Sequence, residues 1–188
     1  MFVTIINDCR DANAFGRQVT RAAALFGCQV HAVAVSGDLE AAGNLVDALD
    51  AAEGRRGVIL ANVAPRHGAA KRWPNGTPFG WFRYGDTFVA ASIDGLTLSL
   101  AKKLGLVDAV EVFDIPEVMA AAAGHRLISK ETAEYVVSTQ FRSLEFLPRA
   151  AHWLSQGYVL PTSRYAVADL AEPPDAVWWV DNFGNCKP

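Results

Sequence analysis

The sequence predicts an α/β domain with a mostly parallel, Rossmann-like sheet and helices on both of its faces. Three short runs rich in β-branched residues, at positions 2–6, 30–35 and 58–63, are typical of buried parallel strands. Amphipathic helical patterns at positions 12–26 and 39–52 separate these runs. The strand–helix–strand–helix–strand order indicates right-handed crossovers between parallel neighbours.

Each of the first elements carries its own signal. Gly27 follows the first predicted helix and can adopt the left-handed backbone conformation that ends many helices. The second predicted helix places Leu45 and Leu49 on one face. Ser36 and Asp38 are residue types that favour the N-cap of that helix.

The second half of the chain is less regular. Residues 64–85 are rich in Pro, Gly, Asn and aromatic side chains and are predicted as one loop, whose length favours a binding loop or lid. The aromatic residues in this stretch, namely Phe79, Trp81, Phe82 and Tyr84, either cover a flat ligand or bury a subunit contact. The later predictions are a strand at 88–92, a helix at 96–104, a strand at 109–113, a helix or loop-plus-helix at 139–156, a connector at 161–174 and a final strand at 176–180.

The composition indicates a globular protein with one main domain. The chain has 188 residues, 51% of them hydrophobic and 20% charged, which suffices for a substantial core. We expect an α/β domain over residues 1–175 and a strand and turn over residues 176–188. The net charge of −3 argues against nucleic acid or an anionic membrane as partner. The N-terminus lacks a signal-peptide pattern, and the expected compartment is the cytoplasm.

The cysteines and the common motifs exclude several kinds of site. Cys9, Cys28 and Cys186 are scattered and form no CxxC pair, so neither a disulfide framework nor a metal site is predicted. The chain has no GxGxxG, no P-loop, no GxSxG and no HExxH motif.

Polar residues at the ends of the predicted strands are the first candidates for a ligand site, because parallel sheets bind ligands there. Asn7 and Asp8 follow the first strand, and a carboxylate at that position can bridge two ribose hydroxyls. The alternative is that Asp8, or Asp11, caps the following helix. His67 lies in the long loop near Lys71 and Arg72, where it either acts in a site or is simply solvated.

The stretch from Trp178 to Asn185 combines an apolar strand with a polar turn. Asp181, Gly184 and Asn185 favour a tight turn whose side chains can point at a ligand.

Several blocks of the chain, in this order, resemble the SAM-dependent hydroxide adenosyltransferases and their fluorinase and chlorinase relatives. They are Asn7-Asp8, residues 57–68 (GVILANVAPRHG), residues 88–98 with Asp94-Gly95-Leu96, residues 138–157, and residues 180–185 (VDNFGN), which is similar to the family turn Asp-Arg-Phe-Gly-Asn.

The resemblance implies that S-adenosylmethionine (SAM) is the substrate, that no further cofactor is needed, and that methionine is displaced from the ribose C5′ carbon. By this comparison Asp8 holds the ribose hydroxyls, with Asp11 nearby as a second substrate-binding candidate. Asp181 lies near the methionine amino group, and Asn185 contacts adenine beside Phe183. A homo-oligomer, possibly a trimer, is also implied, because the family's C-terminal β-domain completes the adenine pocket of a neighbouring subunit. That domain is expected to begin where residues 176–188 end.

The catalytic residues of the family are not all matched. The hydroxide enzymes use an aspartate, an arginine and a histidine, and an ungapped alignment places Ala64, Lys71 and Phe141 there. Arg72 and His67 lie close in sequence and are the candidates to replace the missing groups. Ser143 matches the serine of the halogenases if one residue is deleted.

Three functions therefore remain open. The first is an enzyme that transfers the 5′-deoxyadenosyl group of SAM to water or a halide. The second is an inactive relative that binds an adenine nucleoside or acts as an oligomeric interaction module. The third is an unrelated α/β enzyme, because a shared fold does not establish function.

Overall fold

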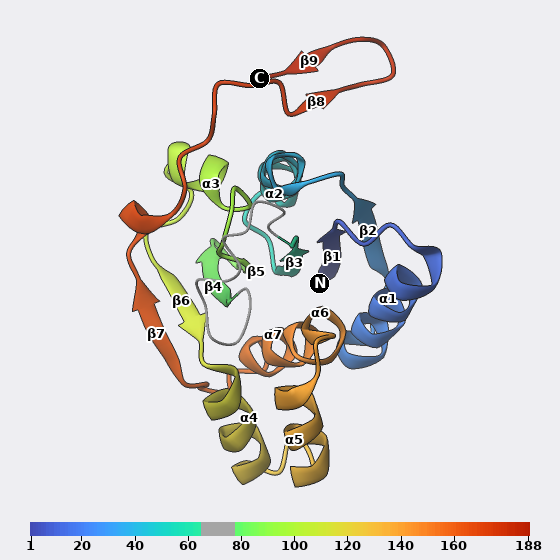
Figure 1. Ribbon diagram of the computed structural model, residues 1–188, viewed down its shortest axis with the longest axis vertical. Helices are drawn as coiled ribbons and strands as arrows, with labels where there is room; N and C mark the ends of the chain where they lie inside the picture. The colour runs from blue at the N-terminus through green and yellow to red at the C-terminus, as the bar shows by residue number, and fades with distance from the viewer. Residues whose placement is uncertain (65–77) are drawn as a thin grey trace.

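A seven-stranded mixed sheet with a parallel core organises the computed structural model, which describes residues 1–64 and 78–188 (Figure 1). The strand order is β2-β1-β3-β5-β4-β6-β7. The strands are β1 (Phe2–Asn7), β2 (Val30–Ala34), β3 (Gly57–Asn62), β4 (Phe79–Tyr84), β5 (Thr87–Ser92), β6 (Val110–Phe113) and β7 (Thr162–Tyr165). The predicted α/β fold class is confirmed.

The parallel core consists of β2, β1, β3 and β5, and its sequence explains its burial. Alternate side chains of β3 enter the two layers of the core: Val58 and Leu60 pack on one face of the sheet, Ile59 and Ala61 on the other. A strand that is covered on both faces needs apolar residues throughout, which is the pattern that predicted it.

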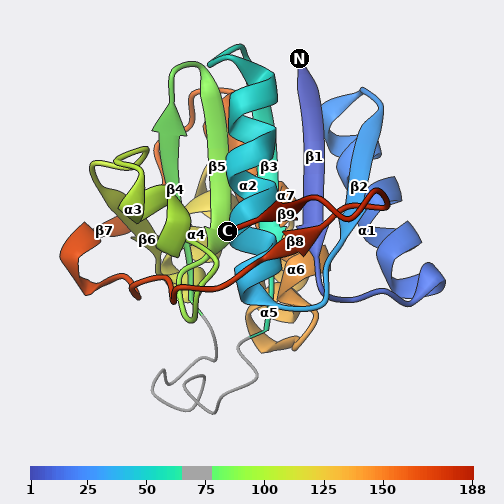
Figure 2. The ribbon, with the colours of Figure 1, turned by 90° about the horizontal axis from the view of Figure 1, so that it is seen from above.

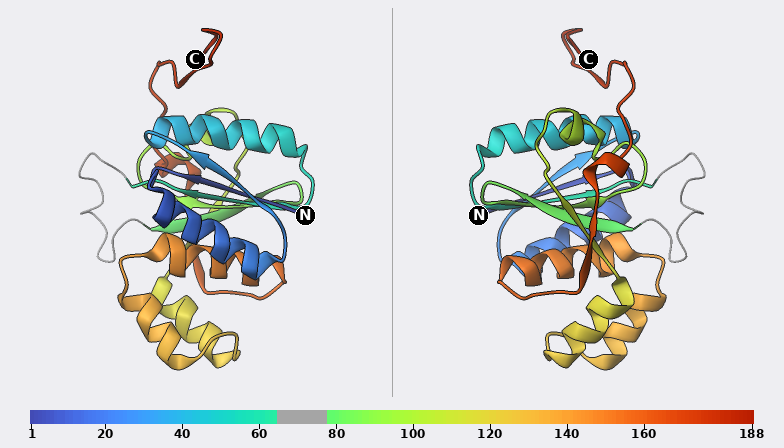
Figure 3. Two further views of the ribbon diagram at one scale, coloured as in Figure 1. Left: turned by 90° about the vertical axis from the view of Figure 1, so that its right-hand side faces the viewer. Right: turned by 90° about the vertical axis from the view of Figure 1, so that its left-hand side faces the viewer.

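Helices cover both faces of the sheet (Figure 3). Side chains of α1 and α7 contribute to one hydrophobic core, whereas side chains of α2 and α3 contribute to the other. The helices are α1 (Ala12–Phe26), α2 (Asp38–Ala52), α3 (Ser99–Lys103), α4 (Ile115–Gly124), α5 (Lys130–Ser138), α6 (Arg142–Glu145) and α7 (Leu147–Ser155). The first helix ends as predicted, since Gly27 has a φ of 63°.

The prediction of a single loop over residues 64–85 is wrong for the described part. Residues Phe79–Tyr84 form β4, which pairs antiparallel with β5 through the two-residue turn Gly85-Asp86. Phe79 and Phe82 are buried in the two cores, and the Trp81 ring stacks on Phe88 at 4.8 Å. These aromatic residues therefore build the sheet, and neither Phe79 nor Phe82 is exposed to a ligand or subunit.

Other differences lie in the second half of the chain. The helix predicted over residues 96–104 is shorter, α3 being five residues long, and α4 and α5 form a helical hairpin that the sequence did not predict. The connector predicted over residues 161–174 contains β7 and a 3-10 turn at Val167–Asp169.

The final predicted strand is only two residues long and belongs to a small hairpin. It consists of β8 (Trp179–Val180) and β9 (Cys186–Lys187), which pair antiparallel outside the main sheet. Within residues 1–64 and 78–188, none of the helices combines the length and the hydropathy needed to cross a membrane.

Candidate functional site

The order of the sheet places a topological switch point between β1 and β3 (Figure 2). From β1 the chain passes through α1 to β2 on one side, then through α2 to β3 on the other side of β1. Because α1 and α2 cover opposite faces, they diverge at the carboxyl ends of these strands. Parallel α/β sheets bind their ligands in the crevice at such a point.

Asp8 lies at this switch point. It directly follows the last residue of β1, and its Oδ2 atom accepts a hydrogen bond from the backbone N–H of Ala64 at 3.3 Å. Ala64 lies just beyond β3, so the carboxylate of Asp8 spans the carboxyl ends of the two strands that flank the switch. The side chain is half-buried, and a ligand in the crevice can reach it.

Asn7 fixes the backbone that presents Asp8. Its side chain is fully buried, and its amide donates a hydrogen bond to the Gln18 side chain of α1. Its Oδ1 atom accepts a hydrogen bond from the backbone N–H of Cys9 at 2.8 Å. Asn7 thus positions the backbone at the end of β1, and its predicted place in a ligand site stays a prediction.

Asp38 joins the second helix to the turn after β5. Its Oδ2 atom accepts a hydrogen bond from the Leu96 N–H at 2.9 Å, and its Oδ1 atom accepts one from the Leu39 N–H at 3.0 Å. The N-cap of α2 is Gly37, so the prediction of Ser36 or Asp38 as N-cap is wrong. The reason is that the Asp38 carboxylate bonds to a distant backbone group.

Asp94 is a residue of interest that the sequence did not single out as a site residue. It follows β5, is 7% exposed, and its Oδ1 atom accepts a hydrogen bond from the Gly95 N–H at 3.1 Å. Its Oδ2 atom is buried without a hydrogen-bond partner among the described residues. The signal that would have found it is its place in the Asp94-Gly95-Leu96 block.

Asp11 occupies the N-cap of α1. Its Oδ1 atom accepts a hydrogen bond from the backbone N–H of Ala14 at 2.8 Å. This is the capping alternative that the sequence had left open for Asp8 or Asp11. The proposed contact of Asp11 with substrate stays a prediction.

Asp181 organises the turn between β8 and β9. Its Oδ1 atom accepts hydrogen bonds from the N–H groups of Phe183 and Asn185, both at 2.8 Å, and its Oδ2 atom accepts one from the Asn185 side chain at 2.7 Å. The hydrogen bond from the Asn185 side chain, followed by that from its backbone, lowers the pKa of Asp181 below its ordinary value. Phe183 is 83% exposed at the tip.

The hairpin lies on the outer side of α2, away from the sheet (Figure 3). Lys187 Nζ is 2.5 Å from Asp47 Oδ2 of α2, and the Trp178 ring packs against Gly43. Asp8 lies at the carboxyl end of β1, whereas the contacts of the hairpin through Lys187 and Trp178 are with α2. The three predicted contacts of the hairpin with substrate, by Asp181, Phe183 and Asn185, stay predictions.

The predicted catalytic residues fall into two groups. Ser143 is half-buried in α6, next to Arg142, whose pKa is lowered by burial. His67, Lys71 and Arg72 lie outside the described residues. Ser143 is therefore the one predicted catalytic residue whose position the structure describes.

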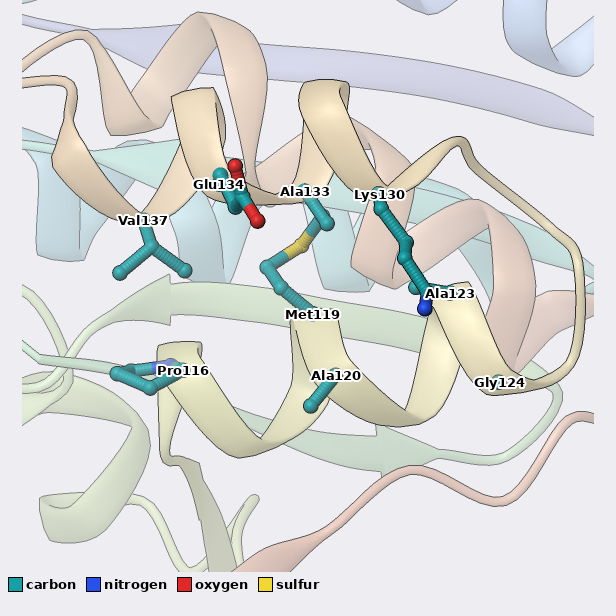
Figure 4. Close-up of a pocket in the computed structure, with 9 residues that line it drawn as sticks. All are labelled: Pro116, Met119, Ala120, Ala123, Gly124, Lys130, Ala133, Glu134 and Val137. Atoms are coloured by element: carbon teal, nitrogen blue, oxygen red, sulfur yellow. The ribbon is translucent and has the colours of Figure 1, made fainter.

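A cavity of about 520 Å³ lies between α4 and α5 (Figure 4). Its lining is largely apolar. The Met119 side chain reaches from α4 toward α5, and the charged Lys130 and Glu134 lie on the α5 side. None of the residues predicted for the site lines it, and it offers few polar groups to orient a nucleoside. In the part of the chain that the structure describes, no group of three or more His, Cys, Asp or Glu side chains is arranged to hold a metal ion.

The fold is similar to two solved structures. One is described as an uncharacterized conserved protein from Thermotoga maritima, with a TM-score of 0.66 and 13% identity over 98% of this chain and 70% of that one. The other is described as a conserved hypothetical protein from Thermus thermophilus, with a TM-score of 0.61 and 22% identity over 98% of this chain and 72% of that one. No family model and no curated protein matches the chain. At these identities the likeness shows a shared fold and nothing further.

Proposed function

We propose that this protein binds SAM at the carboxyl ends of β1 and β3 and cleaves its 5′-deoxyadenosyl group, with water as the simplest acceptor. The observation that carries the proposal is the place of Asp8, whose half-buried carboxylate stands at the topological switch point. A carboxylate at such a point suits two vicinal ribose hydroxyls, which donate to its two oxygens.

The reaction requires little from the protein beyond alignment and desolvation. Water attacks the C5′ carbon, the C5′–sulfur bond breaks, and its electron pair stays on sulfur, which leaves as the neutral thioether of methionine. The attacking water releases one proton to the solvent and becomes the 5′ hydroxyl of adenosine. Because the leaving group is neutral, no general acid is needed, and catalysis depends on positioning the nucleophile in line.

A second candidate is a nucleoside-binding protein without catalytic activity. Ala64 occupies the position that matches the aspartate of the hydroxide enzymes, and its backbone N–H already donates to Asp8. Alanine cannot orient a water molecule through a carboxylate. In this alternative Asp8 still binds the ribose, but the protein does not cleave SAM.

Incubating the purified protein with SAM and following adenosine and methionine by chromatography tests the enzyme. Adding chloride or fluoride in parallel tests transfer to a halide. Formation of adenosine and methionine in equal amounts supports hydrolysis. Calorimetric binding of adenosine without any product supports the second candidate instead.

Asp8→Asn tests the site itself, and Asp86→Asn, in the exposed turn between β4 and β5 at the opposite end of the sheet, is its matched control. We expect Asp8→Asn to weaken adenosine binding at least tenfold, because an amide donates where the ribose needs an acceptor. Asp86→Asn is expected to leave affinity unchanged, since it lies at the amino end of β5, away from Asp8, and asparagine is also common in turns. Equal affinity of wild type and Asp8→Asn would place the site elsewhere.

A further inference from the structure

The β2 end of the sheet has none of the features that normally protect an exposed edge. Among the described residues β2 pairs only with β1, and its sequence, Val-His-Ala-Val-Ala, contains no Lys, Arg, Asp, Glu or Pro. His31, Ala32 and Ala34 are exposed. Natural edge strands usually carry charges, proline or a bulge, because an unpaired row of N–H and C=O groups attracts another strand.

The opposite edge of the same sheet is protected. There β7 is four residues long, carries the exposed Arg164, and is preceded by Pro161. The two edges of one sheet thus differ in the way expected if β7 faces solvent and β2 meets a partner.

The orientation of the β2 backbone shows which residues offer hydrogen bonds. Val35 N–H donates to Asn7 O of β1 at 3.0 Å, so by alternation Val33 and His31 also point toward β1. Val30, Ala32 and Ala34 therefore direct their N–H and C=O groups outward.

We propose that the β2 edge pairs antiparallel with β2 of a second copy of this chain, which continues the sheet across a twofold axis. In the register centred on Ala32, this residue faces its counterpart, and Val30 faces Ala34 of the other copy. These are the three outward-facing residues, so all of them form hydrogen-bonded pairs. Such an interface is self-complementary, as an isologous dimer requires, and no charged side chain of β2 opposes it.

The flank of α1 gives an independent reason for the same partner. Figure 1 shows α1 beside β2 at this end of the sheet, and a twofold axis perpendicular to the sheet sets the two copies of α1 side by side. The Arg21 side chain points toward α6 and away from this end of the sheet, since it donates a hydrogen bond to Glu145 at 2.8 Å. The side of α1 opposite Arg21 carries small, uncharged residues at helical spacing, namely the exposed Ala12 and Gly16 and the half-buried Ala23.

These small residues allow two helices to approach closely. A Cβ atom added at Gly16 would meet no described atom within 4 Å, so this part of α1 is open in the single chain. The strand edge and these residues of α1 lie at the same end of the sheet and carry no charged side chain, so two identical copies can meet there without opposing charges. The inference does not depend on the proposed function.

Light scattering after size-exclusion chromatography tests the pairing through the mass of the particle. Ala32→Lys introduces a charge on each side of the twofold axis, at an exposed position that accommodates the longer side chain. Ser163→Lys on the exposed β7 edge is the matched control. We expect Ala32→Lys to halve the mass and Ser163→Lys to leave it unchanged.

Gly16→Arg is a second variant. The single chain has open space at this position, and arginine has a higher helix propensity than glycine. We expect it to weaken the dimer at least tenfold while the circular dichroism spectrum stays that of wild type. A wild-type protein that is monomeric at a concentration of about 100 μM, on the order of the dissociation constant of a weak specific dimer, would overturn the proposal. An oligomer whose mass is the same in wild type, Ala32→Lys and Gly16→Arg would overturn it as well.

Discussion

Arg21 of α1 and Glu145 of α6 form a partly buried ion pair between residues that are 124 positions apart in the chain. Arg21 Nη1 lies 2.8 Å from Glu145 Oε2, and Arg149 of α7 donates to the same oxygen at 2.8 Å. Glu145 is 6% exposed, so its carboxylate is stabilised by two guanidinium groups in place of water. Arg21, Glu145 and Arg149 together join three helices, α1, α6 and α7.

We expect Glu145→Gln to lower the free energy of unfolding by about 2–3 kcal/mol, because two guanidinium groups lose their counter-charge in a largely buried site. Urea denaturation measures this change. Glu53→Gln is the control, since the pair of Glu53 and Arg55 is exposed and its loss should cost less than about 0.5 kcal/mol. An equal effect of both substitutions would contradict the assigned role of Glu145.

The same carboxylate predicts a pH dependence of stability. Burial raises the pKa of Glu145, but the hydrogen bonds and charges of Arg149 and Arg21 outweigh burial and hold it below its ordinary value. A folded-state pKa below the unfolded value of about 4.3 gives stability that is fully present above about pH 4.3 and is lost as the pH falls through the folded pKa. The difference in unfolding free energy between wild type and Glu145→Gln should therefore shrink below about pH 4.3. A difference that stays constant from about pH 7 to about pH 3 would refute this assignment.

Gly43→Ala should release the C-terminal segment from α2. A Cβ atom at Gly43 would lie 2.1 Å from the Trp178 ring, so the ring must move. Limited proteolysis should then cut near residues 174–180 faster than in wild type, although alanine raises the helix propensity of α2 by about 1 kcal/mol. Gly16→Ala is the control, because Gly16 also lies in a helix but has open space around it. Cleavage at the wild-type rate in Gly43→Ala would show that Trp178 does not hold the segment.

Asp181→Ala should disorder the β8–β9 turn without changing global stability. The substitution removes the acceptor of three hydrogen bonds, two from Asn185 and one from the Phe183 N–H. Amide signals of residues 181–187 in a ¹H–¹⁵N spectrum should move toward random-coil values, while the melting temperature stays within about 2 °C of wild type. Asp175→Ala, at an exposed position before the hairpin, should leave these signals in place. Unchanged signals in Asp181→Ala would mean that the turn does not depend on this carboxylate.

Local sequence patterns sufficed for the first half of the fold. The β1, β2 and β3 strands and the α1 and α2 helices were predicted. Strands buried on both faces must be apolar throughout, and amphipathic helices repeat their apolar residues every three to four positions. The β4 strand was missed because Gly80 and the polar Arg83 interrupt its pattern. The turn residues Gly85-Asp86, between two runs rich in aromatic and apolar residues, were the available signal of a hairpin.

The candidate site, too, was predicted where a local pattern sufficed and missed where tertiary packing decided. The position of Asp8 after a parallel strand was enough to select it, since the carboxyl ends of such strands meet at one edge of a sheet. The buried Asp94 was not selected, because its 7% exposure depends on tertiary packing, which no local pattern contains. The ion pair of Arg21 and Glu145 was missed for the same reason.

The sequence by itself determined the fold class, the parallel core and the switch-point carboxylate, because each follows from the hydrophobic period and order of neighbouring segments. Only the tertiary structure decided how distant residues are combined. It paired β4 and β6 antiparallel, placed the 178–187 hairpin on α2, and left the β2 edge open among the described residues. Those outcomes depend on contacts between segments far apart in the chain, which local propensity does not specify.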